Sequence, residues 1–183
     1  MSARAVSAPR AQIPNALTVL RLVLVPVFAV LLIRSDSGQS VAAAVVFLLA
    51  GITDQIDGFL ARRWHVESSF GAVADPLADR LMIDVAVLLL WLDGRLPFLG
   101  LLVIVARDVI LLAGAKVLQP RGLEVHVNFI GKTATWILYA SIFFVLLTPD
   151  GTTWPLVCFW IGVVLAVVAG VQYILTARRE LRA

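Results

Sequence analysis

The chain has 183 residues, of which 61% are hydrophobic and 15% are charged, and its formal net charge is +3. Soluble domains are about half apolar, so this excess predicts an integral membrane protein and excludes an ordinary soluble domain. The single cysteine, Cys158, excludes an internal disulfide and a metal site built from several cysteines. The sequence has neither a glycine-rich phosphate loop nor the basic and aromatic pattern typical of nucleic-acid binding.

Several apolar segments approach the length of about 20 residues that a bilayer crossing needs. Pro14 and Pro76 fall where two of them begin, and a proline in a first helical turn costs little because its missing N–H has no partner there anyway. The predicted fold class is an all-α integral membrane protein, a bundle of about six transmembrane helices. The spans are expected at about 14–33, 41–63, 73–92, 97–118, 128–147 and 154–175.

We expect one membrane domain, residues 13–177, between a short N-terminal tail (1–12) and a basic C-terminal tail (178–183). Most Lys and Arg residues lie in the two tails, at 62–64 where the second span ends, and at 116–121 where the fourth span ends. The opposite connections carry only Arg34 and Arg95. Because Lys and Arg are enriched in cytosolic loops, this predicts a multi-pass cell-membrane protein with both termini and the site described next in the cytosol.

Four aspartates lie within residues 54–79 of this otherwise apolar chain: Asp54, Asp57, Asp75 and Asp79. Residues three or four positions apart share one face of a helix, so each pair is expected to point one way. Four carboxylates beside hydrocarbon cannot all stay ionised unless cations neutralise them, and hard divalent cations prefer oxygen ligands. The pattern therefore predicts a site for Mg²⁺ or Mn²⁺, against the alternative of acids that merely meet water at the membrane surface.

Small residues accompany the acidic pairs. Gly58 and Ala61 fall on the face of the first pair, and Gly71 lies one turn before Asp75 in the expected connection. With so little side chain at these positions, space remains for a ligand between the two faces. Arg62 follows and can donate paired hydrogen bonds to a phosphate.

Ionic residues occur in other spans as well, where they are costly and usually functional or paired. Arg21, in the first span, could extend to the nearer surface or face the polar site. Arg107 and Asp108 lie near the middle of the fourth span, and adjacent helical residues diverge, so a simple mutual ion pair is not expected. Asp84 is expected to pair or to meet water.

The acidic stretch as a whole resembles the signature of the CDP-alcohol phosphatidyltransferases, integral membrane enzymes of phospholipid synthesis. The opening run IPNALTVLRLVLVPVF also resembles the start of family members, so the resemblance covers nearly the whole chain. It implies transfer of the phosphatidyl group of CDP-diacylglycerol to an alcohol, with release of CMP. Every fixed position of the signature is present, as Asp54-x2-Asp57-Gly58-x2-Ala61-Arg62-x8-Gly71-x3-Asp75-x3-Asp79.

The same resemblance implies a role for each site residue. The four aspartates would hold two Mg²⁺ or Mn²⁺ ions at the donor's pyrophosphate, and Asp79 would also be the general base for the acceptor hydroxyl. CDP-diacylglycerol would be bound by Gly58, Ala61, Arg62 and Gly71. A homodimer is implied too.

The acceptor alcohol is a choice between two members of the family. By resemblance, Arg107 and Lys132 would bind an acceptor's phosphate; alternatively, Arg107 pairs with a carboxylate and Lys132 extends to the surface. Phosphatidylglycerophosphate synthases, which use glycerol-3-phosphate, commonly show Gly-Lys-x-Lys and Arg-Glu where this chain has Gly-Lys-Thr-Ala and Arg-Asp. The runs ARDVILLAGAKV, GITDQIDGFLARRW and ADPLADR are closer to cardiolipin synthases, whose acceptor is phosphatidylglycerol. We therefore predict a cardiolipin synthase, with phosphatidylglycerophosphate synthase as the alternative.

Two other classes of protein, a transporter and a non-catalytic membrane scaffold, fit the sequence less well than an enzyme. A transporter would need no glycine or alanine at positions 58, 61 and 71, and the sequence lacks paired broken helices in two matching halves. A non-catalytic membrane scaffold would tolerate loss of the aspartates.

Overall fold

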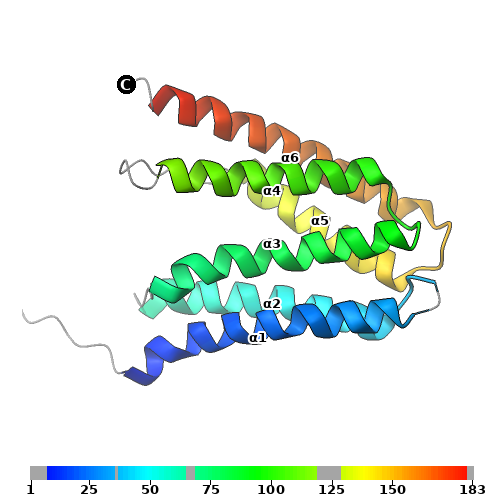
Figure 1. Ribbon diagram of the computed structural model, residues 1–183, viewed down its shortest axis with the longest axis horizontal. Helices are drawn as coiled ribbons and strands as arrows, with labels where there is room; N and C mark the ends of the chain where they lie inside the picture. The colour runs from blue at the N-terminus through cyan, green and yellow to red at the C-terminus, as the bar shows by residue number, and fades with distance from the viewer. Residues whose placement is uncertain (1–7, 36, 65–68, 119–128, 181–183) are drawn as a thin grey trace, which may run out of the picture.

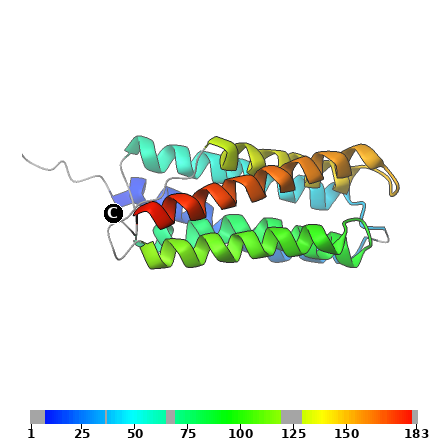
Figure 2. The same cartoon turned by 90° about the horizontal axis from the view of Figure 1, so that it is seen from above.

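The computed structural model describes residues 8–35, 37–64, 69–118 and 129–180. Six α-helices make up this part of the chain, which contains no strand, and they run side by side along one long axis (Figures 1 and 2). Successive helices run in opposite directions (Figure 1). Their bounds are α1 Ala8–Ile33, α2 Val41–Trp64, α3 Ser69–Leu92, α4 Phe98–Leu118, α5 Phe129–Leu147 and α6 Thr153–Glu180.

The predicted all-α architecture is confirmed, and six helices lie where six apolar segments were expected. By length and composition, three helices within the described residues could each cross a membrane, with the apolar windows Ala16–Ile33, Phe129–Leu147 and Thr153–Arg178. The two described ends of the chain lie at the same end of the bundle (Figure 1). The three connections α1–α2, α3–α4 and α5–α6 lie together at the other end, which we call the loop end.

Two helices begin earlier than the sequence predicts. α1 begins at Ala8 and α3 at Ser69, so neither Pro14 nor Pro76 lies in a first turn. A proline inside a helix removes one backbone hydrogen bond, and both helices continue through that loss. Gly71 consequently lies on α3 and not in the α2–α3 connection, which corrects the predicted position.

The core cluster draws buried residues from all six helices. Phe28, Phe47, Met82 and Leu138, from α1, α2, α3 and α5 respectively, are fully or almost fully buried. The outward faces remain apolar, since many Val, Leu and Ile side chains of the bundle are exposed. An exposed surface of this kind suits lipid better than water.

Small residues let α6 approach its neighbours closely. A Cβ added at Gly162 would lie 2.9 Å from side-chain atoms of Leu138 on α5, and one at Gly100 on α4 would lie 2.5 Å from the Phe159 ring. Gly162 and the buried Ala166 therefore serve close helix packing inside the bundle.

Each connection at the loop end contains a glycine with a left-handed backbone. The φ angles are 62° at Gly38, 73° at Gly94 and 81° at Gly151, a region that L-residues with a Cβ rarely adopt. Gly38 also packs tightly, because an added Cβ would lie 2.9 Å from Cγ of Arg95. The close approach of two separate connections thus depends on this glycine.

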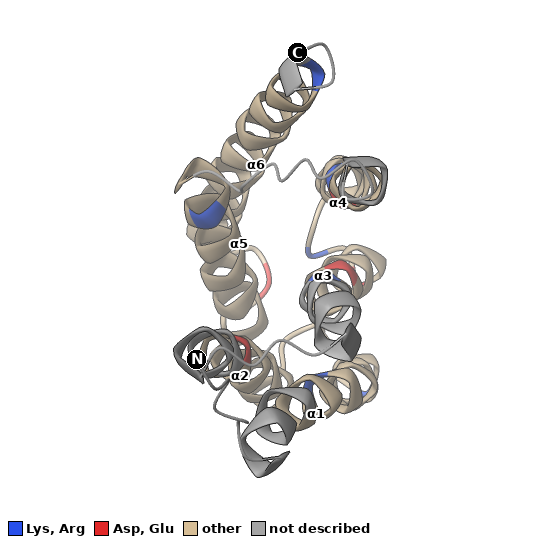
Figure 3. Cartoon of the chain, turned by 90° about the vertical axis from the view of Figure 1, so that its left-hand side faces the viewer, with Lys and Arg blue, Asp and Glu red and all other residues tan. Residues whose placement is uncertain are grey.

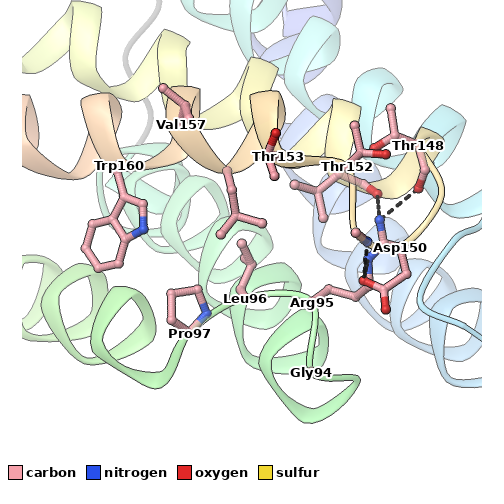
Figure 4. Close-up of a pocket in the computed structure, with 13 residues that line it drawn as sticks. Gly94, Arg95, Leu96, Pro97, Thr148, Asp150, Thr152, Thr153, Val157 and Trp160 are labelled. Atoms are coloured by element: carbon pink, nitrogen blue, oxygen red, sulfur yellow. Dashed lines mark hydrogen bonds and ion pairs between the residues drawn. The ribbon is translucent and has the colours of Figure 1, made fainter.

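A buried arginine joins all three connections at the loop end, and Figure 4 shows it beside Thr148 and Asp150 of the α5–α6 connection. Arg95 Nη1 donates to the carbonyl oxygen of Ser37 at 3.2 Å, and Nη2 donates to those of Val145 and Thr148 at 2.7 and 2.8 Å. Its Nε lies 3.5 Å from Oδ1 of the exposed Asp150. Carbonyl groups at helix ends lack internal partners, and here one guanidinium satisfies several of them. A cavity of about 510 Å³ between the starts of α4 and α6 adjoins this arginine.

Arg95→Met should lower the free energy of unfolding by about 3 kcal/mol, because buried carbonyl groups lose a charged donor. Thermal unfolding of the detergent-purified protein would measure this as a lower Tm. Arg34→Met is the matched control, since Arg34 is an exposed arginine at the same end. Equal Tm values for the two variants would contradict a stabilising role of the Arg95 contacts.

Candidate functional site

The two acidic segments lie at the end of the bundle opposite the loop end, which we call the site end. The last part of α2 carries Asp54 and Asp57, and the first part of α3 carries Asp75 and Asp79. These two helices contact each other, and α2 ends and α3 begins at this end (Figure 1). Figure 3 looks onto this end of the bundle. The backbone therefore places both segments at one end of the bundle, and their role as a metal site stays a prediction.

Side chains are described for three of the predicted site residues, namely Asp54, Arg107 and Lys132. Among the residues with described side chains, no three His, Cys, Asp or Glu gather as a metal site would need. The predicted metal cluster depends on aspartates outside that set, so it stays a prediction. The remaining predicted site residues have their side chains outside the described part: Asp57, Gly58, Ala61, Arg62, Gly71, Asp75 and Asp79.

Asp54 is held from α1 by a buried arginine. Nη1 of Arg21 lies 3.1 Å from Oδ1 of Asp54, and the Arg21 side chain is 0% exposed whereas that of Asp54 is 25% exposed. On the outer side, Nε2 of Gln55 donates to Oδ2 of Asp54 at 3.2 Å. Of the two directions considered for Arg21, the structure thus favours the polar site over the membrane surface.

A second ionic cluster joins α3 to α4. Nη1 of Arg80 donates to the backbone carbonyl of Asp108 at 3.1 Å and to its Oδ1 at 3.3 Å. Nη1 of Arg107 lies 3.4 Å from the same Oδ1. Arg107 and Asp108 do contact each other, but not as a simple mutual pair, because Asp108 is shared with Arg80. No pattern in the sequence indicates a role for Arg80, which directly follows Asp79.

Two buried polar atoms near this cluster have no hydrogen-bond partner among the described residues. They are Nε of Arg107 and Oδ1 of Asp84. Buried polar groups are nearly always satisfied, so each such atom calls for an explanation. Arg107 pairs with a carboxylate and still keeps one donor available to a ligand. No described residue forms a hydrogen bond with Oδ1 of Asp84. The expectation that Asp84 pairs or meets water therefore stays a prediction for this oxygen.

A groove of about 750 Å³ runs between α2 and α5. Asp54, Gln55 and Lys132 supply its polar groups, and most of its remaining lining is aromatic or aliphatic. The absence of a side chain at Gly51 lets the Tyr139 ring pack close to α2 within the groove, since an added Cβ would lie 3.0 Å from that ring. Lys132 is exposed, and the described residues offer it no ion pair. The further lining residues are Phe47, Leu48, Ile52, Ile56, Gly131, Thr135, Trp136, Ala140, Phe143 and Phe144.

By resemblance, Lys132 and Arg107 are both expected to bind the acceptor's phosphate. The structure places Lys132 with Asp54 on the α2–α5 groove, whereas Arg107 is not among the groove's lining residues and lies in the α3–α4 cluster. The two cations therefore occupy different positions around the site end.

Comparison with known proteins identifies the family. The family model described as CDP-alcohol phosphatidyltransferase matches residues 11–168. Over 185 residues the chain is 40% identical to "Cardiolipin synthase (CMP-forming)" of Streptomyces coelicolor, covering 93% of this chain and 85% of the relative. Two proteins called CDP-diacylglycerol–glycerol-3-phosphate 3-phosphatidyltransferase are also similar. That of Bacillus subtilis is 29% identical, with 88% and 92% covered, and that of Escherichia coli is 31% identical, with 92% and 96% covered.

The family model spans most of the chain, from α1 into α6, and the relatives are matched over most of their own length. Members of this family are membrane-integral enzymes that transfer substituted phosphate groups and use divalent metal ions. This agrees with the apolar helical bundle and with the signature aspartates on α2 and α3. The chain belongs to the CDP-alcohol phosphatidyltransferase family.

Proposed function

We propose that this protein is a cardiolipin synthase, which transfers the phosphatidyl group of CDP-diacylglycerol to phosphatidylglycerol and releases CMP. The observation that carries the proposal is the α2–α5 groove, which joins a signature aspartate to an apolar channel. The choice of acceptor is supported by the 40% identity to the Streptomyces coelicolor cardiolipin synthase.

The groove suits a substrate with a charged head and a hydrocarbon chain. Asp54 and Lys132 would lie beside the head, and Phe47, Trp136 and Phe143 would contact the chain. Both substrates of a cardiolipin synthase are lipids of this kind. The reaction must therefore take place where a polar site adjoins hydrocarbon, and this groove provides such a boundary.

The four signature aspartates would hold two Mg²⁺ or Mn²⁺ ions, which supply positive charge at the donor's pyrophosphate when bound. Asp54 fits a metal ligand, because its carboxylate is a hard oxygen donor that is partly exposed at the groove. Asp79 would take the proton of the acceptor hydroxyl, whose oxygen then attacks the phosphatidyl phosphorus while CMP leaves.

Four further residues of the signature would bind the donor. At Gly58, Ala61 and Gly71 the absence of larger side chains would leave space for the nucleotide against the helices. Arg62 would donate hydrogen bonds to a phosphate.

The acceptor's phosphate would be bound by two basic residues. Lys132 is exposed at the groove and has no ion pair among the described residues. Arg107 shares Asp108 with Arg80, and its unpartnered Nε could donate to an anion. A phosphodiester acceptor needs less positive charge than a phosphate monoester, which agrees with Ala134 in place of a second lysine.

Phosphatidylglycerophosphate synthase is the second candidate. It is favoured by the identities of 29% and 31% to proteins named for transfer to glycerol-3-phosphate. The two candidates share the donor and the proposed aspartate chemistry, so they differ in the acceptor alone.

The orientation and assembly of the protein are part of the proposal. All six helices would cross the cell membrane, which is supported by the two described chain ends at one end of the bundle (Figure 2). The site end would face the cytosol, because most Lys and Arg belong to segments at that end. A homodimer is expected from family resemblance.

An acceptor screen tests the choice between the two candidates. Purified protein with CDP-diacylglycerol and Mg²⁺ or Mn²⁺ should release CMP when phosphatidylglycerol is added. Release with glycerol-3-phosphate alone would make the protein a phosphatidylglycerophosphate synthase. Release with neither, from protein that binds the donor, would contradict both candidates and point to another alcohol.

Removal of divalent metal should silence the enzyme, because the donor's pyrophosphate would then lack its counter-charge. A chelator should abolish CMP release, and excess Mg²⁺ or Mn²⁺ should restore it. Sodium chloride at matched ionic strength, added to the chelated enzyme, serves as the control and should not restore activity. Activity that survives chelation would argue against a metal-dependent transfer.

Asp79→Asn should reduce CMP release at least about 100-fold while leaving binding of CDP-diacylglycerol largely intact, since a general base contributes on that scale. The matched control is Asp93→Asn, an exposed aspartate at the loop end. A pure loss of donor binding would instead make Asp79 only a metal ligand.

A further inference from the structure

We propose that Arg21 is a positioning residue that fixes the carboxylate of Asp54 for its divalent cation. The inference deepens the proposed function and rests on it. Its basis is the contact of 3.1 Å between Nη1 of Arg21 and Oδ1 of Asp54, which joins α1 to α2 at the site end.

The burial of the two partners is unequal, and this decides what Arg21 can do. The guanidinium is completely buried, so no substrate phosphate reaches it without rearrangement. The carboxylate is partly exposed and lines the α2–α5 groove. A ligand that approaches from the groove therefore meets Asp54, and Arg21 acts on that ligand through Asp54.

The two oxygens of Asp54 have different surroundings. Oδ1 is held by the charged Arg21, whereas Oδ2 accepts one hydrogen bond of 3.2 Å from the exposed Gln55 on the same helix. A neutral, exposed amide is readily displaced by a cation, and a buried guanidinium is not. Asp54 would thus offer Oδ2 to the metal while Arg21 fixes the plane of the carboxylate.

A charge buried within an apolar helix is costly unless it is paired. Arg21 is among the largest fully buried side chains of the protein, and α1 packs directly against α2. Residues that orient a metal ligand typically change metal affinity or activity by about 10- to 100-fold when substituted. This sets the size of the effect that the positioning role predicts.

The test measures Mn²⁺ binding to the full-length protein in detergent, without donor or acceptor, from the electron paramagnetic resonance signal of free Mn²⁺. Arg21→Lys and Arg21→Gln should weaken Mn²⁺ binding about 10-fold. Arg34→Gln, a change at an exposed arginine near the other end of α1, should leave it unchanged. An unchanged affinity in the Arg21 variants would overturn the proposal, because a purely structural residue would lower only the Tm. Tighter binding would also overturn it, since Arg21 would then compete with the cation.

A second pair of variants keeps the test valid if Arg21→Gln fails to fold. In an Asp54→Asn background, Arg21→Lys should weaken Mn²⁺ binding no further, because both substitutions act on one ligand. Losses that multiply would show that Arg21 acts elsewhere and would overturn the proposal.

The outcome is separable from that of the proposed function. If the unsubstituted protein releases CMP but substitution of Arg21 does not change the Mn²⁺ affinity, the inference is wrong and the proposed function stands. Arg21-dependent Mn²⁺ binding without CMP release from any acceptor would sink the proposed function alone. Absence of saturable Mn²⁺ binding by the unsubstituted protein would overturn the inference.

Discussion

The structure depends on one constraint, namely that charge inside an apolar bundle must be paired. Arg21, Arg80 and Arg95 each meet this constraint by reaching across to a different helix or connection. Packing of apolar surfaces alone would let neighbouring helices rotate or slide with little change in free energy. A guanidinium that must contact an acceptor on another helix fixes both the rotation of the two helices and their register along the bundle.

The two ends of the bundle satisfy this constraint in opposite ways. At the loop end, Arg95 donates hydrogen bonds to the backbone carbonyl groups of three residues, so its charge is stabilised by contacts within the fold. At the site end, pairing among the described residues is incomplete: Asp54 is partly exposed, Lys132 has no ion pair, and Nε of Arg107 has no hydrogen-bond partner. Polar groups that stay available in this way are what a binding site needs, whereas the contacts of Arg95 only stabilise the fold.

Hydropathy and the spacing of the aspartates could be read from the sequence, because a bilayer sets helix length and a helix sets which residues share a face. The partners of Arg21 and Arg80 could not, because they depend on how separate helices are rotated against each other. The sequence predicts later starts for α1 and α3 than the structure shows, because Pro14 and Pro76 are typical of a first helical turn. A long helix can nevertheless continue through the loss of one backbone hydrogen bond. The roles of Asp57, Asp75 and Asp79 still rest on the family signature.

The α2–α5 groove also determines how such an enzyme is supplied. On the proposed function, a lipid that reaches Asp54 past Trp136 would move sideways within the plane of the bilayer and would not pass through water. Its availability is then set by the mole fraction of that lipid in the membrane. Dilution of the membrane with inert lipid or detergent would slow turnover even when the bulk concentration of substrate is unchanged.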